Sequence, residues 1–293
     1  MSQLLKIFIW VFSLLPLPIV HLIGVILAWG FILVPNKRRS TIKTNLAICF
    51  PNLSSNQRSR LLRNNLLETG KGIIETGVLW CWSKKRVLKL IKKVEGKELL
   101  DQAMSSGKGC ILAAPHLGVW EILGVYASPQ YPMTIMYRPP PLAGMDSLIR
   151  RARERVGAKL VPTDRAGVKS LYAALGKGEL IGVLPDQDPG PGGGVFAPYF
   201  GTQANTMTLL SRLAAKTGAT VVFGYVERLK FGRGYVIHFT KGSEEINQKD
   251  TLTSCTAVNA GVEKCVRVLP DQYLWCYKRF RCRPEGEAHF YSR

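Results

Sequence analysis

The chain has 293 residues, with 40 Lys and Arg against 20 Asp and Glu, and a net charge of +20. This length allows one large α/β domain or two small ones, and the charge calls for an anionic partner: nucleic acid, a phospholipid surface, a phosphorylated substrate or an acidic protein. The seven cysteines are odd in number and lack CxxC or Cys/His ligand spacing, which argues against a disulfide framework or a zinc site and indicates reduced thiols facing the cytosol.

The N-terminal stretch is apolar. Residues 7–36 carry no formal charge, and about 20 such residues suffice to span a bilayer. We therefore expect a membrane anchor over residues 1–36. Pro16, Pro18 and His21 interrupt it near the middle, so a kinked or re-entrant helix and a straight span both stay open. The basic cluster at 37–39 follows directly, and the positive-inside rule then puts residues 37–293, the expected catalytic domain, on the cytoplasmic face. The alternatives are a signal peptide, for which the stretch is too long and lacks an Ala-x-Ala end, and a buried globular helix.

Two helices are predicted next, a short one over residues 40–50 and a long one that Ser54 or Ser55 caps. In the long helix, Leu and Ile recur at helical spacing while Arg and Lys occupy the other faces. That pattern is typical of a core helix with a solvated outer face, and it is compatible with a position beside a membrane. Trp80 and Trp82 precede a Lys-Lys-Arg run and predict a further interfacial contact, since indole rings favour the headgroup level.

Beyond residue 108, short apolar runs alternate with helical segments. The strand-like runs are 109–115, 133–137, 158–162, 180–184 and 219–226, and the helical segments between them are 122–127, 146–156, 166–177 and 207–216. This alternation predicts an α/β fold with a mixed central sheet flanked by helices. Sites in such sheets lie at the carboxyl ends of strands.

A histidine and a carboxylate lie at one of these strand ends. Residues five apart on a continuous helix are splayed by about 140°, so His116 must lie in the turn, which Pro115 and Gly118 suit, if Glu121 is to reach it. A carboxylate that fixes the tautomer of a histidine lets the other ring nitrogen take a proton from a hydroxyl as it attacks an acyl carbon. We predict His116 as this general base and Glu121 as its partner. Cys110 lies nearby, but packing is its favoured role.

Three further motifs follow later strands. They are YRPPPL at 137–142, PDQDPG at 185–190 with GVFAPYFG at 194–201, and the C-terminal stretch from 272 to 287. With the histidine turn and the apolar N-terminus, this set resembles the bacterial late acyltransferases of lipid A biosynthesis, in the lysophospholipid acyltransferase superfamily. The resemblance covers essentially the whole chain.

The resemblance implies an enzyme on the cytoplasmic face of the inner membrane. It would move a fatty acyl group from acyl carrier protein, as the thioester, to a hydroxyl on a Kdo-bearing lipid A precursor or similar anionic glycolipid, in contact with membrane phospholipid. It implies substrate-binding roles for Arg138 and Arg153, which suit phosphate or a developing oxyanion, and for the acidic loop of Asp186 and Asp188. We expect no cofactor and no metal ion.

Several alternatives stay open. The acceptor could be another glycolipid or an aminoacyl lipid, Arg138 and Arg153 could be ordinary surface arginines, and hydrogen bonds to the backbone could account for Asp186 and Asp188. The spacing of those two aspartates also suits the divalent-metal site of a glycosyltransferase, which would leave the histidine turn unexplained. The cations and aromatics at 278–283 would suit a membrane-tethered nucleic-acid binder. Anionic lipid and acyl carrier protein use the same charge, so we expect no nucleic-acid partner.

Overall fold

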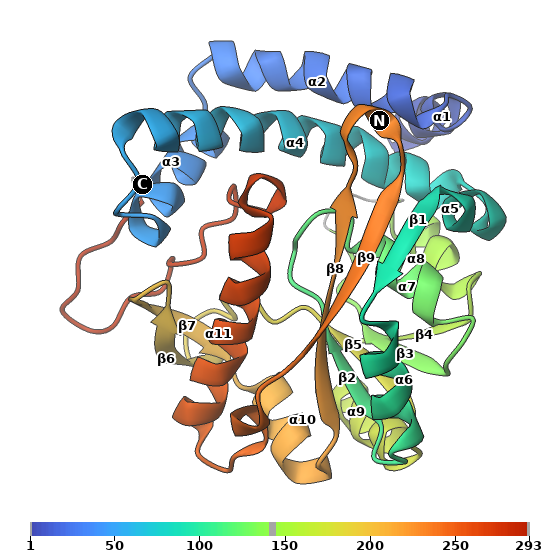
Figure 1. Ribbon diagram of the computed structural model, residues 1–293, viewed down its shortest axis with the longest axis vertical. Coiled ribbons are helices and arrows are strands. Elements are labelled where there is room, and N and C mark those ends of the chain that lie inside the picture. Colours follow the sequence, from blue (N-terminus) through green and yellow to red (C-terminus); the bar gives the residue numbers. More distant parts are fainter. Residues whose placement is uncertain (1, 141–144, 292–293) are drawn as a thin grey trace.

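A seven-stranded mixed sheet forms the centre of the protein (Figure 1). The computed structural model describes residues 2–140 and 145–291. Across the sheet, the strands are β1 (Ile91–Glu95), β9 (Tyr235–Lys241), β8 (Thr220–Arg228), β2 (Cys110–Ala113), β5 (Leu180–Val183), β3 (Met133–Met136) and β4 (Ala158–Val161). The last five run parallel to one another, whereas β9 is antiparallel to β8 and parallel to β1. The predicted α/β fold with a mixed sheet is confirmed.

All five predicted apolar runs form strands of this sheet, with small shifts at their ends. The prediction missed β1 and β9, and also the separate antiparallel hairpin of β6 (Gly194–Tyr199) and β7 (Thr202–Met207). β1, β7 and β9 carry polar side chains, so they lack the continuous apolar run of a strand that is buried on both faces. β6 is apolar but contains Pro198 and follows a Pro/Gly-rich run, which is typical of a loop.

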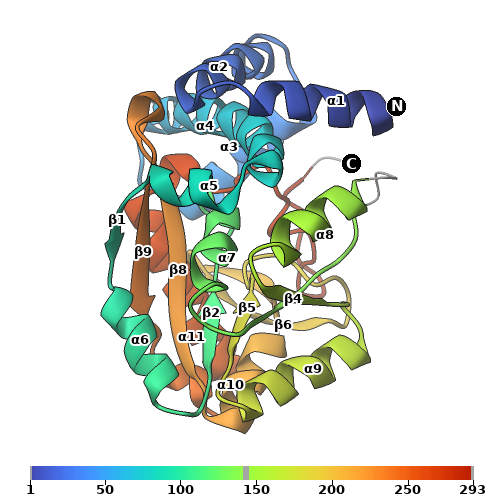
Figure 2. The same cartoon turned by 90° about the vertical axis from the view of Figure 1, so that its right-hand side faces the viewer.

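Helices cover both faces of the sheet (Figure 2). On one face lie α6 (Lys97–Ser105) and α7 (Glu121–Ala127), and on the other lie α9 (Arg165–Gly176), α10 (Leu209–Thr217) and α11 (Thr251–Val268). Successive residues of β2 point to opposite faces of the sheet and pack into two different hydrophobic cores. Ile111 packs with α9, α10 and α11, whereas Leu112 packs with α6 and α7. The helices α5 (Lys84–Leu90) and α8 (Asp146–Glu154) lie toward the α7 side.

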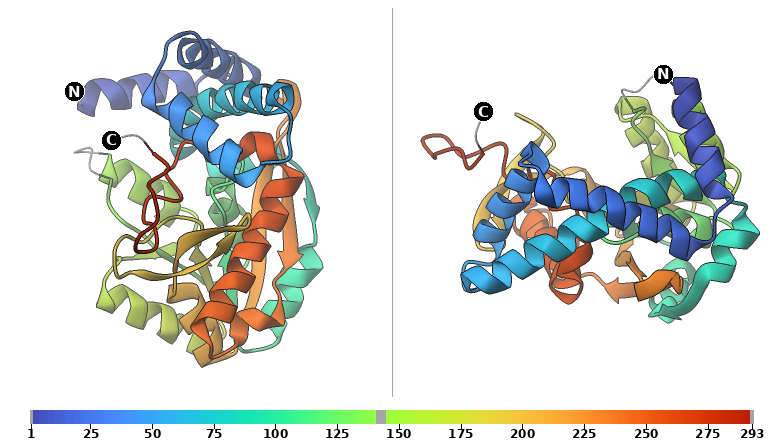
Figure 3. Two further views of the ribbon diagram at one scale, coloured as in Figure 1. Left: turned by 90° about the vertical axis from the view of Figure 1, so that its left-hand side faces the viewer. Right: turned by 90° about the horizontal axis from the view of Figure 1, so that it is seen from above.

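A helical layer lies across the end of the sheet at which the parallel strands terminate (Figures 1 and 3). It consists of α1 (Ser2–Ser13), α2 (Leu17–Leu33), α3 (Lys37–Cys49) and α4 (Ser55–Cys81). Ser54 caps α4 in a reciprocal capping box with Gln57, as the sequence predicted. The helices α2 and α4 touch through Gly24 and Gly70, where a Cβ added to Gly70 would lie 2.2 Å from the Gly24 carbonyl oxygen. Only glycine permits this approach.

The apolar N-terminus is broken between α1 and α2, at Pro16, so of the two forms that the sequence left open it adopts the kinked one. Among the described helices, none alone has both the length and the hydropathy to cross a bilayer, and only α2 with α3 reaches them as a pair, bent by 82°. One side of α2 is buried against the domain through Val20, His21 and Ala28. The opposite side, together with α1, exposes large apolar side chains: Ile7, Phe8, Trp10, Val11, Leu14, Ile19, Leu22, Ile26, Trp29 and Leu33. We call this set the apolar face of α1 and α2.

The expected interfacial contact of Trp82 is wrong. This side chain is buried, with 2% of the residue exposed, and its indole N–H donates to the backbone oxygen of Ser13 at 2.6 Å. Arg86 stacks on the same ring and donates to the Ser13 and Leu15 carbonyls. The tryptophan and the arginine therefore hold the turn between α1 and α2 on the domain.

Candidate functional site

His116 lies in a turn that the end of β8 and the C-terminal segment hold. The His116 carbonyl accepts the N–H of Leu274, and the Gly118 N–H donates to the carbonyl of Gln272, both at 3.0 Å. Gly118 has a φ of 61°, and a Cβ there would lie 1.8 Å from the Val226 carbonyl oxygen, so no other residue fits. The turn is fixed to the end of β8 and to the C-terminal segment, and the histidine side chain has a defined direction.

The carboxylate that holds His116 is Asp186. Asp186 follows β5, the strand beside β2, and its two oxygens bind the backbone N–H and the Nδ1 of His116, each at 2.8 Å. The Asp186 side chain is only 2% exposed. Burial acts to raise the pKa of Asp186, but the charge of His116 and hydrogen bonds from His116 and Tyr273 hold that pKa below its ordinary value. An ionised Asp186 fixes the proton of His116 on Nδ1.

The opposite ring nitrogen of His116 is then an acceptor. The amide Nε2 of Gln187 lies 3.2 Å from the His116 Nε2 and donates to it. The ring also packs edge to face on Trp120, with ring centroids 4.9 Å apart. A basic nitrogen held from behind by a carboxylate is the arrangement of a general base, and a substrate hydroxyl would take the position of the Gln187 amide.

The expected pairing of His116 with Glu121 is not present, and this is a correction to the prediction. Glu121 begins α7 and points toward α8, where Arg153 binds it through two hydrogen bonds, Nε to Oε2 at 3.1 Å and an Nη2 to Oε1 at 2.5 Å. Trp120, the residue before Glu121, packs against the His116 ring. The bent chain thus separates the two side chains and sends Glu121 to a cation on a neighbouring helix.

Asp186 and Asp188 do not share one site. The Asp188 carboxylate accepts hydrogen bonds from the N–H groups of Gly190 and Cys282 and from the side chain of Asn205. These bonds lower the pKa of Asp188, against the opposing effect of its burial. Asp188 therefore binds its own loop to the C-terminal segment.

Arg138 lies on the surface after β3, apart from the His116 group. The last two residues of the YRPPPL motif fall outside the described residues. In the C-terminal block, Arg279 is buried, donates to the Asn205 carbonyl and the Thr206 hydroxyl, and lies over the Tyr199 ring. That arginine packs the protein interior and is closed to nucleic acid.

Two cavities lie near the histidine turn and share part of their walls. The larger lies between α1, α4 and the His116 turn, and the space open to the centre of a water molecule is about 580 Å³. The smaller, about 80 Å³ by the same measure, lies between the sheet and α7 and α8, and its walls are mostly apolar. Trp80, Trp120 and Glu121 line both. Side chains of α1, among them Phe8 and Phe12, form a wall of the larger cavity.

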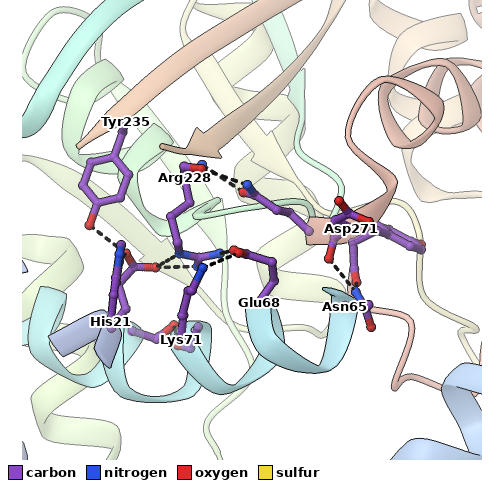
Figure 4. A network of polar contacts seen from close by, with 12 residues as sticks. His21, Asn65, Glu68, Lys71, Arg228, Tyr235 and Asp271 are labelled. Carbon is purple, nitrogen blue, oxygen red and sulfur yellow. Dashed lines mark hydrogen bonds and ion pairs between the residues drawn. The ribbon is translucent and has the colours of Figure 1, made fainter. Parts of the chain in front are cut away.

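Figure 4 shows a buried network of charges, two members of which, Glu68 and Arg228, line the larger cavity. Arg228, at the end of β8, binds Glu75 through Nε at 2.8 Å and Glu68 through an Nη1 at 2.8 Å. Glu75 also accepts a hydrogen bond from Tyr235 and lies 2.7 Å from the Nε2 of His21 on α2. Burial disfavours the charge on Glu75, but Arg228 and His21 lower the pKa of Glu75 from 4.5 to about 2. The network fixes α2 and α4 to the sheet.

Sequence reasoning missed the partner role of Asp186, although it selected the residue, and it missed Gln187 and Arg228 altogether. The signal for Asp186 was its position directly after an apolar run, like that of His116. The signal for the buried network was His21, the one histidine inside the apolar N-terminal stretch.

Comparisons with known proteins agree over nearly the whole chain. The family model for bacterial lipid A biosynthesis acyltransferases matches residues 2–282. The chain is 30% identical over 279 residues to a lipid A biosynthesis lauroyltransferase of Escherichia coli strain K12, covering 95% of this chain and 90% of that protein. It is 30% identical over 290 residues to a palmitoleoyltransferase of the same strain, covering 97% and 92%. A lipid A biosynthesis acyltransferase of Haemophilus influenzae is 30% identical over 278 residues, covering 94% and 88%.

Proposed function

Because the chain belongs to the bacterial lipid A biosynthesis acyltransferase family, and is therefore an acyltransferase, we propose that it moves a fatty acyl group from acyl carrier protein to a hydroxyl of a Kdo-bearing lipid A precursor. The observation that carries this proposal is the His116–Asp186 pair: His116 lines the larger cavity, and Trp120, which packs on its ring, lines both cavities. The chemistry requires a base for a hydroxyl and apolar space for acyl chains, and these residues supply both.

His116 is the proposed general base. Its Nε2 removes the proton of the acceptor hydroxyl as the oxygen attacks the thioester carbonyl, and Asp186 stabilises the imidazolium that forms. Collapse of the tetrahedral intermediate breaks the carbon–sulfur bond, and the imidazolium returns its proton to the leaving thiolate. No covalent acyl-enzyme is needed. Burial raises the pKa of the Cys110 thiol to about 12, so Cys110 is unsuited to act as a thiolate nucleophile.

Glu121 and Arg153 act as a second pair in this proposal. Glu121 orients the Arg153 guanidinium, which lines the smaller cavity next to the base. A guanidinium fixed by a carboxylate can stabilise the oxyanion of the intermediate or bind a phosphate of the substrate. The exposed Arg138 suits the phosphates of the acceptor, and Asp188 acts indirectly because it fixes the loop that carries Asp186.

The two cavities suit two different chains. We assign the donor acyl chain to the smaller cavity, where Leu112, Met133 and Gly182 lie deeper than the strand ends. The larger cavity, with a wall of α1 side chains, suits the acyl chains of the acceptor. A lipid acceptor must enter from a membrane, and the apolar face of α1 and α2 supports attachment to the inner membrane, with the basic cluster at 37–39 favouring its cytoplasmic side.

The test is acyl transfer with purified protein, acyl carrier protein thioesters and a Kdo-bearing lipid A precursor in detergent, with the product identified by mass spectrometry. We expect a gain of one acyl chain with the wild-type protein and a loss of turnover by about 10²–10⁴-fold in His116→Ala. Product made only with another glycolipid or an aminoacyl lipid would reassign the acceptor. Near-normal turnover in His116→Ala, an acyl group trapped on a cysteine, or loss of activity in EDTA with rescue by manganese would each contradict the mechanism.

A further inference from the structure

The tip of the β8–β9 hairpin carries a feature that the acyl-transfer site does not explain. Residues Lys230 to Arg233 form a tight turn in which the Arg233 N–H donates to the Lys230 carbonyl at 3.4 Å. Its two central residues, Phe231 and Gly232, both have positive φ, 59° and 68°. Positive φ at both central positions defines a type I′ turn, for which Asn-Gly is the preferred sequence. Phenylalanine stands where asparagine is the ordinary residue.

Phe231 has no packing role that would offset this conformation. It is 83% exposed, the highest value among the large apolar side chains in the described ranges 2–140 and 145–291. A bulky residue in the left-handed region is an outlier that costs conformational energy, and an exposed ring also orders water around it. Both costs destabilise the free protein, so we look for a contact of the ring with a partner outside the molecule that compensates for them.

The neighbouring charges indicate the chemistry of that contact. Lys230 and Arg233 flank the ring and are both exposed. Neither forms an ion pair within 4 Å with a carboxylate in the part of the chain that the structure describes. An apolar ring between two cations fits a surface with anionic groups above an apolar layer, which is a bilayer containing acidic phospholipid.

The position of the tip agrees with this partner. Figure 1 shows the hairpin reaching the helical layer beside α2. The contact is close, because a Cβ added to Gly232 would lie 2.6 Å from the backbone nitrogen of Pro18. The next residues of α2 include Ile19 and Leu22, which belong to the apolar face of α1 and α2. The tip is thus next to the surface to which we assign the membrane.

We propose that the hairpin tip is a second membrane contact, which inserts Phe231 among the lipid acyl chains while Lys230 and Arg233 bind lipid phosphates. This inference rests on the proposed attachment to the membrane. Two contacts, one on α1 and α2 and one on a hairpin of the sheet, fix the tilt of the domain on the bilayer. The helix α2 then lies along the membrane surface, because a helix crossing the bilayer would withdraw its buried side from α4 and the hairpin.

The test compares Phe231→Asn with the wild type in sedimentation with vesicles of phosphatidylethanolamine and phosphatidylglycerol. Asparagine suits the turn, so the variant should fold at least as stably as the wild type, and its thermal midpoint reports this. We expect vesicle partition to weaken by about 10-fold or more from the loss of one inserted phenyl ring. The matched control is Leu252→Asn, an exposed apolar residue at the start of α11, which should partition like the wild type.

A second variant keeps the ring and removes the charge. Lys230→Gln with Arg233→Gln should reduce partition on vesicles that contain phosphatidylglycerol by about 10-fold and leave partition on phosphatidylcholine vesicles unchanged. Equal partition of Phe231→Asn and the wild type would overturn the proposal. Acyl transfer by both variants in detergent distinguishes the membrane contact of the hairpin tip from the proposed function. Retained activity with weakened vesicle binding supports the membrane contact and leaves the proposed function intact. Failure of the wild-type protein in detergent would count against the proposed function alone.

Discussion

The pairing of His116 with Asp186 leads to a specific prediction for Asp186→Asn. The aspartate accepts two hydrogen bonds from His116, one from the backbone N–H and one from Nδ1, each at 2.8 Å. An asparagine has one acceptor oxygen and an NH2 group that only donates. If the oxygen keeps the backbone bond, the NH2 group faces Nδ1, and the ring must adopt the tautomer with its proton on Nε2. That tautomer cannot accept the proton of the substrate.

The magnitude follows from the loss of the base. Removing a positioned general base costs about 10²–10⁴-fold in rate, and the same aspartate-to-asparagine change behind a catalytic histidine in serine proteases costs about 10⁴-fold. We expect kcat in Asp186→Asn to fall by about 10³-fold with little change in KM for the acceptor. The side chain is buried, so circular dichroism must show that the variant is folded.

The assay is initial-rate acyl transfer with the acyl carrier protein thioester, run in parallel on Glu121→Gln. Glu121 binds Arg153 and not His116, so Glu121→Gln should lower the rate through Arg153, and by less than Asp186→Asn does. The reasoning is refuted if Asp186→Asn retains wild-type kcat while Glu121→Gln lowers kcat by about 10³-fold. That outcome would restore the His116–Glu121 pair.

Three further predictions concern the smaller cavity and the buried network. A Cβ on Gly182 would lie 2.9 Å from the Met133 Cε, so Gly182→Ala should shorten the smaller cavity and Met133→Ala should lengthen it. The preferred donor chain should become shorter in the first variant and longer in the second, by about 4-fold in kcat/KM per methylene. An equal change of chain preference in Met104→Ala would contradict this. Glu75→Gln leaves Arg228 buried with only Glu68, and urea unfolding should show a loss of about 3 kcal/mol, which the double variant Glu75→Gln/Arg228→Met should largely restore. Since the folded-state pKa of Glu75 is lowered from 4.5 to about 2, its stabilisation is complete above pH 4.5 and lost as the pH falls toward 2; a wild-type acid profile in Glu75→Gln would be inconsistent with this.

The strands buried on both faces could be predicted because burial on two sides leaves a continuous apolar run in the sequence. β9 could not, since its buried residues alternate with partly exposed ones such as His238 and Thr240. The order of strands in the sheet was also beyond the sequence. β2 and β5 are neighbours although β3 and β4 lie between them in the chain, and only that arrangement joins His116 to Asp186 across 70 residues.

In the candidate site, too, the sequence predicted local features but not the contacts between distant segments. Local chemistry selected His116, because a turn after a strand exposes a side chain at the sheet edge. It assigned the nearest carboxylate in sequence, Glu121, as partner, whereas the partner in space is Asp186. In the apolar N-terminus, composition indicated a membrane-seeking segment. Composition could not indicate that His21 and Gly24 lie on one side of α2 and join it to α4.

Arg228 connects α2 and α4 to the histidine turn. Its side chain binds Glu75, which contacts His21 on α2. Its backbone N–H and carbonyl bind the Oε1 and Nε2 of Gln272, both at 2.9 Å, and the Gln272 carbonyl accepts the Gly118 N–H of the turn. One residue therefore ties the helix that carries the apolar face to the loop that carries His116. If α2 lies on the bilayer, this connection holds His116 at a fixed depth below the lipid surface, so an acceptor hydroxyl can reach it while the acyl chains of the acceptor remain in apolar surroundings.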